Sequence, residues 1–189
     1  MGRDLADVIR RHRGGEHAAS DWLARRTLTI ALRTATAVTG SREQAADIAQ
    51  DVAVQALRGV GRLNDPERFD VWVHRITVRT TMRAIRGKRR RGTVEEPLAD
   101  DLEPVGEHGA FEQVAERAAM RRALADLPER QRIALALRYV HDLSEEEVAE
   151  ALGCRPGTAA SLLSRGRELL RQSAALADFA PARPRGGTQ

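Results

Sequence analysis

The amino-acid sequence predicts an all-α protein made of two small helical domains joined by a flexible acidic linker. Alanine and arginine are the two commonest residues, with 31 and 30 copies, and both rank high in helix propensity. Aromatic residues make up only 3% of the chain, so residues that favour β-strands are scarce. The charge is also divided into blocks along the chain, and this division predicts where the domains begin and end.

Three blocks lie behind the formal net charge of +4. Residues 1–91 carry 19 basic and 10 acidic residues, residues 92–112 carry seven acidic and no basic ones, and residues 113–189 carry 12 basic and 10 acidic ones. The middle block also holds prolines and glycines, which favour a mobile linker over a long surface loop within one domain. We therefore expect domains at 1–91 and 113–176, a linker at 92–112 and a disordered tail at 177–189.

Several classes of protein are excluded at this stage. No apolar run approaches the ~18–20 residues that span a membrane and no signal-peptide pattern opens the chain, so we expect a cytoplasmic protein without membrane insertion. The single Cys154 excludes an internal disulfide, and the five histidines lack the spacing of metal ligands. No Gly-rich phosphate loop or Ser-His-Asp pattern is present, so we expect no metal, no cofactor and no catalytic residue.

The N-terminal block predicts three long helices. The first spans about residues 17–39 and ends at Gly40. Ser41 and Gln44 predict a capping box that opens the second helix. A loop follows from Gly59, after which Asp65 is a suitable N-cap and Pro66 a suitable first residue for the third helix.

The third helix carries the densest basic run of the chain. No acidic residue occurs between Val71 and Arg91. Arg75, Arg79 and Arg83 lie four residues apart, so they share one helical face and repel one another unless a polyanion lies against them. A solvated face is the simpler alternative, but we interpret the run as a phosphate-binding surface. Its candidate DNA contacts are Arg75, Arg79, Arg83, Arg86, Lys88, Arg89 and Arg90.

The C-terminal block predicts a helix-turn-helix. Ser144 and Glu147 form a second capping box before a short helix, Gly153 ends that helix, and Pro156 can begin a longer one. A helical hairpin without DNA binding remains the alternative. If the longer helix enters the major groove, its candidate contacts are Arg155, Thr158, Ser161, Arg165 and Arg167.

Two sets of motifs occur in a fixed order along the chain. The C-terminal block contains the segments LADLPERQR (124–132), LRY (137–139), LSEEEVA (143–149), GT (157–158) and SRGR (164–167), and the N-terminal block contains QAADIAQD (44–51) and FDVWVHRI (69–76). The first set resembles conserved region 4, and the second set resembles two helices of region 2, of the extracytoplasmic-function (ECF) sigma factors of bacterial RNA polymerase, members of the sigma-70 family. The similarity covers roughly residues 17–91 and 113–173.

The resemblance implies a division of labour. Region 2 would dock on the clamp helices of the largest polymerase subunit through Asp47, Gln50 and Asp51. It would also melt the −10 promoter element, its loop around Asn64 holding an extruded base while the basic helix grips the backbone. Region 4 would read the −35 element and contact the flap of the second-largest subunit. Polymerase performs the chemistry, and an anti-sigma factor is a family-level expectation.

The sequence departs from the family pattern in its recognition helix. Ala160 and Leu162 stand where basic residues are usual, and we hypothesise that Leu162 leaves an apolar spot on the reading face. Arg79 and Arg83 stand where the family often has Asn and Asp. Because aromatic residues are few, we expect base capture to depend on a polar loop and arginines.

Two other functions remain open at this stage. One is a stand-alone helix-turn-helix transcriptional regulator, and the other is a polymerase-binding interaction protein that no longer reads promoters. We also expect the acidic linker to be able to fold against the basic helix and screen its charge.

Overall fold

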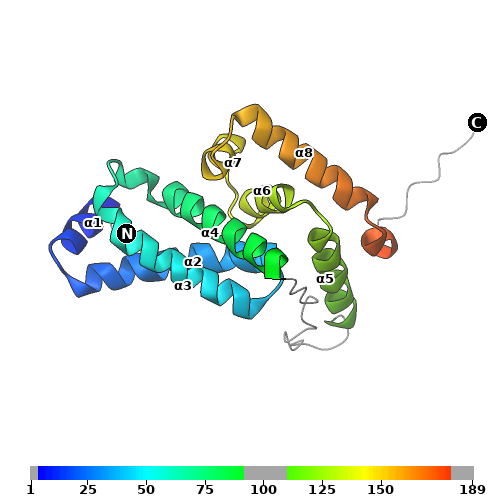
Figure 1. The fold of residues 1–189 in the computed structure, drawn as a ribbon, viewed down its shortest axis with the longest axis horizontal. Coiled ribbons are helices and arrows are strands. Elements are labelled where there is room, and N and C mark those ends of the chain that lie inside the picture. Colours follow the sequence, from blue (N-terminus) through cyan, green and yellow to red (C-terminus); the bar gives the residue numbers. More distant parts are fainter. Residues whose placement is uncertain (1–3, 92–109, 180–189) are drawn as a thin grey trace, which may run out of the picture.

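The computed structural model describes residues 4–91 and 110–179, and within these ranges the chain forms helices and turns and no strand. The all-α prediction is therefore confirmed. The α-helices in Figure 1 are α1 (Leu5–Arg13), α2 (His17–Thr39), α3 (Arg42–Gly59), α4 (Phe69–Arg91), α5 (Ala110–Ala125), α6 (Glu129–Val140), α7 (Glu145–Leu152) and α8 (Pro156–Gln172). None of the described helices is long and apolar enough to cross a membrane.

The N-terminal unit, α1–α4, is built on the α2–α3 hairpin, with α4 packed against both helices. Its core is formed by buried side chains such as Leu23, Val52, Phe69 and Val73. The first helix, α1, was not predicted. It begins at a cap in which the Asp4 carboxylate accepts the Ala6 N–H at 3.0 Å.

Local capping chemistry sets most of the helix boundaries. Gly40 and Gly153 end α2 and α7 in the left-handed conformation, with φ of 67° and 62°. The capping box of Ser144 and Glu147 is complete. At Ser41 only half of the predicted box forms: the hydroxyl accepts the Gln44 N–H, but the Ser41 N–H donates to the Thr39 hydroxyl oxygen instead of the Gln44 side chain.

The connection into α4 is more ordered than the predicted loop. Two 3₁₀ turns, Val60–Arg62 and Pro66–Arg68, lead directly to Phe69. The Asp65 carboxylate accepts the Glu67 N–H at 3.1 Å, so the predicted cap is present, but it opens the second 3₁₀ turn rather than α4 itself.

The C-terminal unit, α5–α8, is a second helical assembly with its own core, which includes Ile133, Leu137, Val148 and Leu163. Helix α5 begins at Ala110 and so includes the last three residues of the predicted linker, and the rest of that linker lies outside the described residues. The expected screening of the basic helix by the acidic linker also concerns residues outside the described ranges. The 3₁₀ segment Ala174–Phe179 packs against α5 and includes the first residues of the predicted tail.

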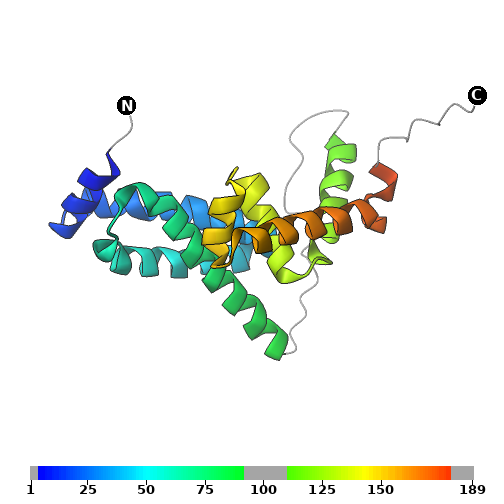
Figure 2. The same cartoon turned by 90° about the horizontal axis from the view of Figure 1, so that it is seen from above.

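The two units pack directly against one another, a closed arrangement in which α6 lies on α2 and α7 lies beside α4 (Figures 1 and 2). Val38 of α2 and Val78 of α4 are buried in the second core beside Leu127 and Ile133 of the C-terminal unit. Apolar burial is thus continuous across the seam between the units, which places the surfaces of α4 and α7 side by side.

Candidate nucleic-acid interface

The arginine ridge, Arg75, Arg79 and Arg83, runs along the exposed side of α4. The intervening residues point the other way: Val73, Ile76 to Val78, Thr80 and Thr81 are buried against α2, α3 and the C-terminal unit. Helical periodicity therefore turns the apolar stripe inward and leaves the three guanidinium groups on one solvent-facing line. This matches the placement that the sequence predicted.

The other basic residues of α4 that we expect to contact DNA differ in their exposure to solvent. Arg89 and Arg90 are exposed, and Lys88 is half-buried. Arg86 is exposed but lies 4.0 Å from the Glu129 carboxylate of α6, so this cation partly faces the seam between the units. The ridge and the two exposed terminal arginines therefore form the accessible cationic surface.

A cavity of about 350 Å³, here called the loop cavity, opens at the N-terminal end of the ridge. The 3₁₀ turns and the first turns of α4 form its walls, and the predicted base-holding residue Asn64 is part of the lining. The other lining residues are Gly59, Arg62, Leu63, Asp65, Arg68, Trp72, Arg75 and, from α7, Glu150. The cavity thus combines a polar loop, three arginines and an aromatic ring.

Trp72 is the aromatic lining residue of the loop cavity, and it was not singled out from the sequence. Its ring is half-buried and lies against Gly59, where an added Cβ would come within 3.1 Å of the indole. A glycine at the end of α3 is therefore what lets the ring approach. The cavity lining thus adds an aromatic ring to the polar loop and arginines that we expect to capture a base. The spacing of Arg68, Trp72 and Arg75 on one helical face is the signal that could have placed this ring beside the arginines.

The predicted polymerase-docking residues Asp47, Gln50 and Asp51 are all exposed on the outer side of α3. Val54 follows them at helical spacing, and 48% of its surface is exposed. This apolar residue was not singled out from the sequence, although its position one turn after Gln50 places it on the same face. In contrast, Gln55 donates to the Thr80 hydroxyl at 3.1 Å and ties α3 to α4.

The helix-turn-helix is formed by α7, the turn at Gly153 and α8. Buried Gly166 allows α8 to lie close to α6, since a Cβ there would come within 3.0 Å of Leu135. The opposite face of α8 is open to solvent (Figure 1). All five predicted contacts are exposed on it or on its N-cap: Arg155, Thr158, Ser161, Arg165 and Arg167.

Leu162, for which we hypothesised an apolar spot on the reading face, keeps only part of its side chain exposed. Leu162 is half-buried and packs against the core of the C-terminal unit, and Ala160 is half-buried as well. The reason is the rotation of α8, which buries Ala159 and Leu163 and draws the neighbouring residues toward the same side. The exposed side of α8 therefore carries polar and basic side chains together with Leu169, 41% of whose surface is exposed, and a part of Leu162.

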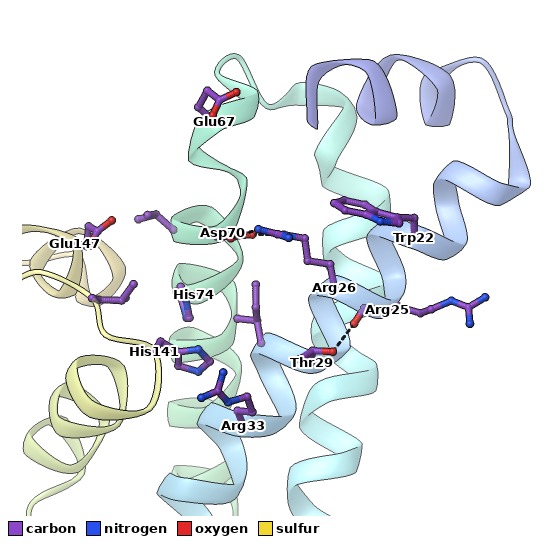
Figure 3. Close-up of a pocket in the computed structure, with 13 residues that line it drawn as sticks. Trp22, Arg25, Arg26, Thr29, Arg33, Glu67, Asp70, His74, His141 and Glu147 are labelled. Carbon is purple, nitrogen blue, oxygen red and sulfur yellow. Dashed lines mark hydrogen bonds and ion pairs between the residues drawn. The ribbon is translucent and has the colours of Figure 1, made fainter. Parts of the chain in front are cut away.

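The seam between the units holds a second cavity of about 710 Å³, lined by α2, α4 and the α6–α7 connection (Figure 3). Arg26 donates to Asp70 there at 2.7 Å and lies over the Trp22 ring (Figure 3). Its lining arginines are matched by Glu67, Asp70 and Glu147, so the cavity has a balanced charge.

Two histidines, one from each unit, meet at this seam. The rings of His74 and His141 lie edge to face with centroids 4.5 Å apart. The Thr34 hydroxyl donates to the Ile30 carbonyl, so it accepts the Nε2–H of His141 at 2.8 Å. Burial and the adjacent His141 lower the pKa of His74 to about 4. Burial and Arg33 lower the pKa of His141 to about 4.

The chain is similar in sequence and in fold to known proteins. Family profiles described as Sigma-70 region 2 and Sigma-70, region 4 match residues 23–91 and 117–170. The chain is 32% identical over 168 residues to the ECF RNA polymerase sigma factor SigM of Mycobacterium tuberculosis, covering 89% of this chain and 83% of the relative. It is 30% identical to the RNA polymerase sigma-H factor of Pseudomonas aeruginosa, covering 68% and 72%.

Two solved structures have the same fold. CnrH, in complex with the cytosolic domain of CnrY, matches with a TM-score of 0.66 at 20% identity, over 94% of this chain and 100% of that chain. The sigma factor RpoE of Bartonella quintana, in complex with the anti-sigma factor NepR, matches with a TM-score of 0.64 at 22% identity, over 77% and 90%.

Proposed function

The chain belongs to the ECF RNA polymerase sigma factors of the sigma-70 family, and from this premise we propose which of its surfaces carry each step of promoter-specific transcription initiation. As a sigma factor it binds core RNA polymerase and promoter DNA. Membership in this family disfavours the stand-alone regulator and the interaction protein without promoter reading. In our proposal the N-terminal unit acts at the −10 element, the C-terminal unit acts at the −35 element, and neither contributes a catalytic group.

The single observation that carries the −10 assignment is the arginine ridge leading into the loop cavity. The ridge would bind successive phosphates, and the loop cavity would hold a base that has left the duplex stack. Flipping a base costs a few kcal/mol, and contacts in the cavity and along the ridge would offset that cost. Trp72 would contribute through stacking, which is worth about 1–3 kcal/mol per base in single-strand binders.

At the −35 element the exposed face of α8 would enter the major groove. Arg165 and Arg167 suit guanine edges or phosphates, and Thr158 and Ser161 suit either kind of base. Arg155, as the exposed N-cap residue, lies where a helix N-terminus meets the DNA backbone. The docking surface on α3 would meet the polymerase clamp helices through Asp47, Gln50, Asp51 and the exposed Val54.

Transcription in vitro with core polymerase on a promoter library tests the proposal. We expect defined start sites that require the protein. In the same assay Arg79→Gln should weaken open-complex formation and lower the salt dependence of single-strand binding by about 0.7 in slope, the value for one phosphate contact. The matched control is Arg122→Gln, which removes the same charge from the exposed side of α5. Core binding without start sites would contradict the function, and equal effects of both variants would contradict the assignment of the ridge.

The regulation of the chain is also a proposal. The Bartonella structure contains an anti-sigma factor, and we propose that a protein of that class holds this chain when it is not on polymerase. We further place the protein in the cytoplasm, where polymerase acts. A purified candidate partner should form a complex with the full chain and reduce its binding to core polymerase.

A further inference from the structure

The loop cavity contains one residue that does not belong to the N-terminal unit. Glu150 of α7 is part of its lining, and its carboxylate forms an ion pair with Arg68. The two residues are 82 positions apart in the chain and meet only because α7 packs beside α4 (Figure 1). The closed arrangement therefore brings a carboxylate of the C-terminal unit to the cavity that we assign to the −10 element.

The charges around Glu150 favour a negatively charged occupant. Arg62, Arg68 and Arg75 line the cavity, against the carboxylates of Asp65 and Glu150. The Asp65 carboxylate already accepts the Glu67 N–H at the start of the second 3₁₀ turn. Glu150 is therefore the carboxylate that is available to pair with an arginine of this cavity, as a phosphate of single-stranded DNA would.

We propose that Glu150 is a built-in competitor of promoter DNA, a carboxylate that occupies Arg68, one of the three arginines lining the loop cavity, until the −10 strand displaces it. This inference depends on the proposed function of the loop cavity and adds a regulatory contact to it. The contact affects only one of the two DNA-binding surfaces, because the reading residues of α8 stay exposed in the same arrangement. The closed protein can thus present its −35 surface while one arginine of its −10 surface is occupied.

The strength of the contact suits this role. The Arg68 and Glu150 side chains keep 54% and 38% of their surface exposed, and ion pairs with that degree of exposure are weak. A weak pair lowers the affinity of the cavity for DNA without preventing its displacement. We therefore expect removal of the Glu150 charge to raise single-strand affinity by about two- to fivefold.

The experiment measures binding of the full chain to a short fluorescein-labelled single strand of mixed sequence, by anisotropy at low salt. Glu150→Gln keeps the shape of the side chain and should raise the affinity, and the gain should shrink as salt screens the charges. The control is Glu145→Gln, which removes the same charge from the first turn of α7, outside the cavity. Arg75→Gln tests whether the cavity binds the strand at all.

The possible outcomes of this experiment separate the proposed role of Glu150 from the proposed function of the loop cavity. A gain with Glu150→Gln, none with Glu145→Gln and a loss with Arg75→Gln support the competitor. Equal gains in both glutamate variants would reflect net charge alone and would overturn the competitor proposal. The proposal is also overturned if Glu150→Gln brings no gain in affinity while Arg75→Gln still loses affinity. An Arg75→Gln protein that binds as well as the wild type overturns the function proposed for the cavity itself.

Discussion

At the scale of single residues, Trp72 defines the character of the loop cavity. The chain has only two tryptophans, and the other, Trp22, lies at the seam cavity with Arg26. The Trp72 ring packs against the Phe69 ring, at 6.0 Å between centroids, and lies close to Gly59. A ring fixed in this way can stack on a base without first losing conformational freedom.

Trp72 can therefore be used as a reporter. In a Trp22→Phe variant, Trp72 is the only tryptophan left, and its fluorescence should be quenched when single-stranded DNA is added, because an indole stacked on a base loses emission. The complementary Trp72→Phe variant, which keeps Trp22, should respond weakly and should bind the strand several-fold less tightly. Quenching confined to Trp22 would contradict the assignment of the loop cavity.

The histidine pair at the seam predicts a pH dependence. His74 and His141 have pKa values of about 4 in the folded chain, against about 6.5 when exposed, so the open or unfolded state binds protons more tightly. Their contribution to stability is fully present above pH 6.5 and is lost progressively as the pH falls toward 4. The charged groups that act on the pair are Arg33, Asp70 and Asp142.

Urea unfolding between pH 7.5 and pH 5 measures this effect. The wild type should lose stability over that interval, and a His141→Gln variant, which keeps a hydrogen-bond donor for the Thr34 hydroxyl, should lose less. Because carboxylates also titrate toward the acidic end, the difference between the two proteins is the informative quantity. Identical pH profiles would show that the pair is not coupled to folding.

At the scale of the elements, α3 and α8 are both amphipathic helices with one buried apolar face and one exposed polar face. Each helix buries small or branched apolar residues on one side and leaves polar ones outside: Val52 and Ala56 against Gln50 and Asp51 in α3, for example. In α8 the buried face includes Gly166, which has no side chain and therefore lets the helix pack close to α6. A helix ordered in this way can present a functional face without loss of stability.

The docking face of α3 gives a prediction on this scale. The double variant Asp47→Arg with Gln50→Ala should weaken core polymerase binding about tenfold or more, because central interface residues commonly contribute over 1 kcal/mol. The thermal midpoint should stay near the wild-type value, since both side chains are exposed. Asp21→Arg, an exposed carboxylate on α2, is the control for charge. Wild-type affinity in the double variant would refute the docking assignment.

At the scale of the whole molecule, the closed arrangement combines an apolar interface between the two units with hydrogen bonds at its edge. The Arg132 guanidinium of α6 donates to the Val38 carbonyl of α2 at 2.9 Å and to the Ala125 and Leu127 carbonyls at 2.8 and 3.0 Å. Burial lowers the pKa of this guanidinium, an effect that the nearby carboxylates of Glu129 and Asp126 oppose. Arg132 is thus a half-buried cation that joins the end of α2 to the turn between α5 and α6.

Replacement of Arg132 should open the molecule. Arg132→Met keeps the length of the side chain but leaves three carbonyls without their donor, at a cost of about 1–3 kcal/mol. We expect a larger radius of gyration by small-angle scattering and a lower unfolding midpoint. Arg130→Met, on the exposed side of the same helix, should change neither. An unchanged radius in Arg132→Met would mean that the apolar seam alone keeps the units together.

Much of the fold follows from local chemistry in the sequence. Ser144 with Glu147, Gly40, Gly153 and Pro156 mark helix ends because caps and left-handed turns involve residues within a few positions of each other. The arginine ridge could be predicted for the same reason, since four-residue spacing places side chains on one face of any helix. The family resemblance also rests on such contiguous motifs, so sequence alone was sufficient to reach it.

The remaining features depend on contacts between distant parts of the chain. Leu162 packs into the core, Val38 and Val78 are covered by the C-terminal unit, and Glu150 meets Arg68 across 82 positions. Helical periodicity says which residues share a face, but not what that face packs against. That choice is made by the total apolar surface that the two units bury together, a property of the folded chain that no local pattern encodes.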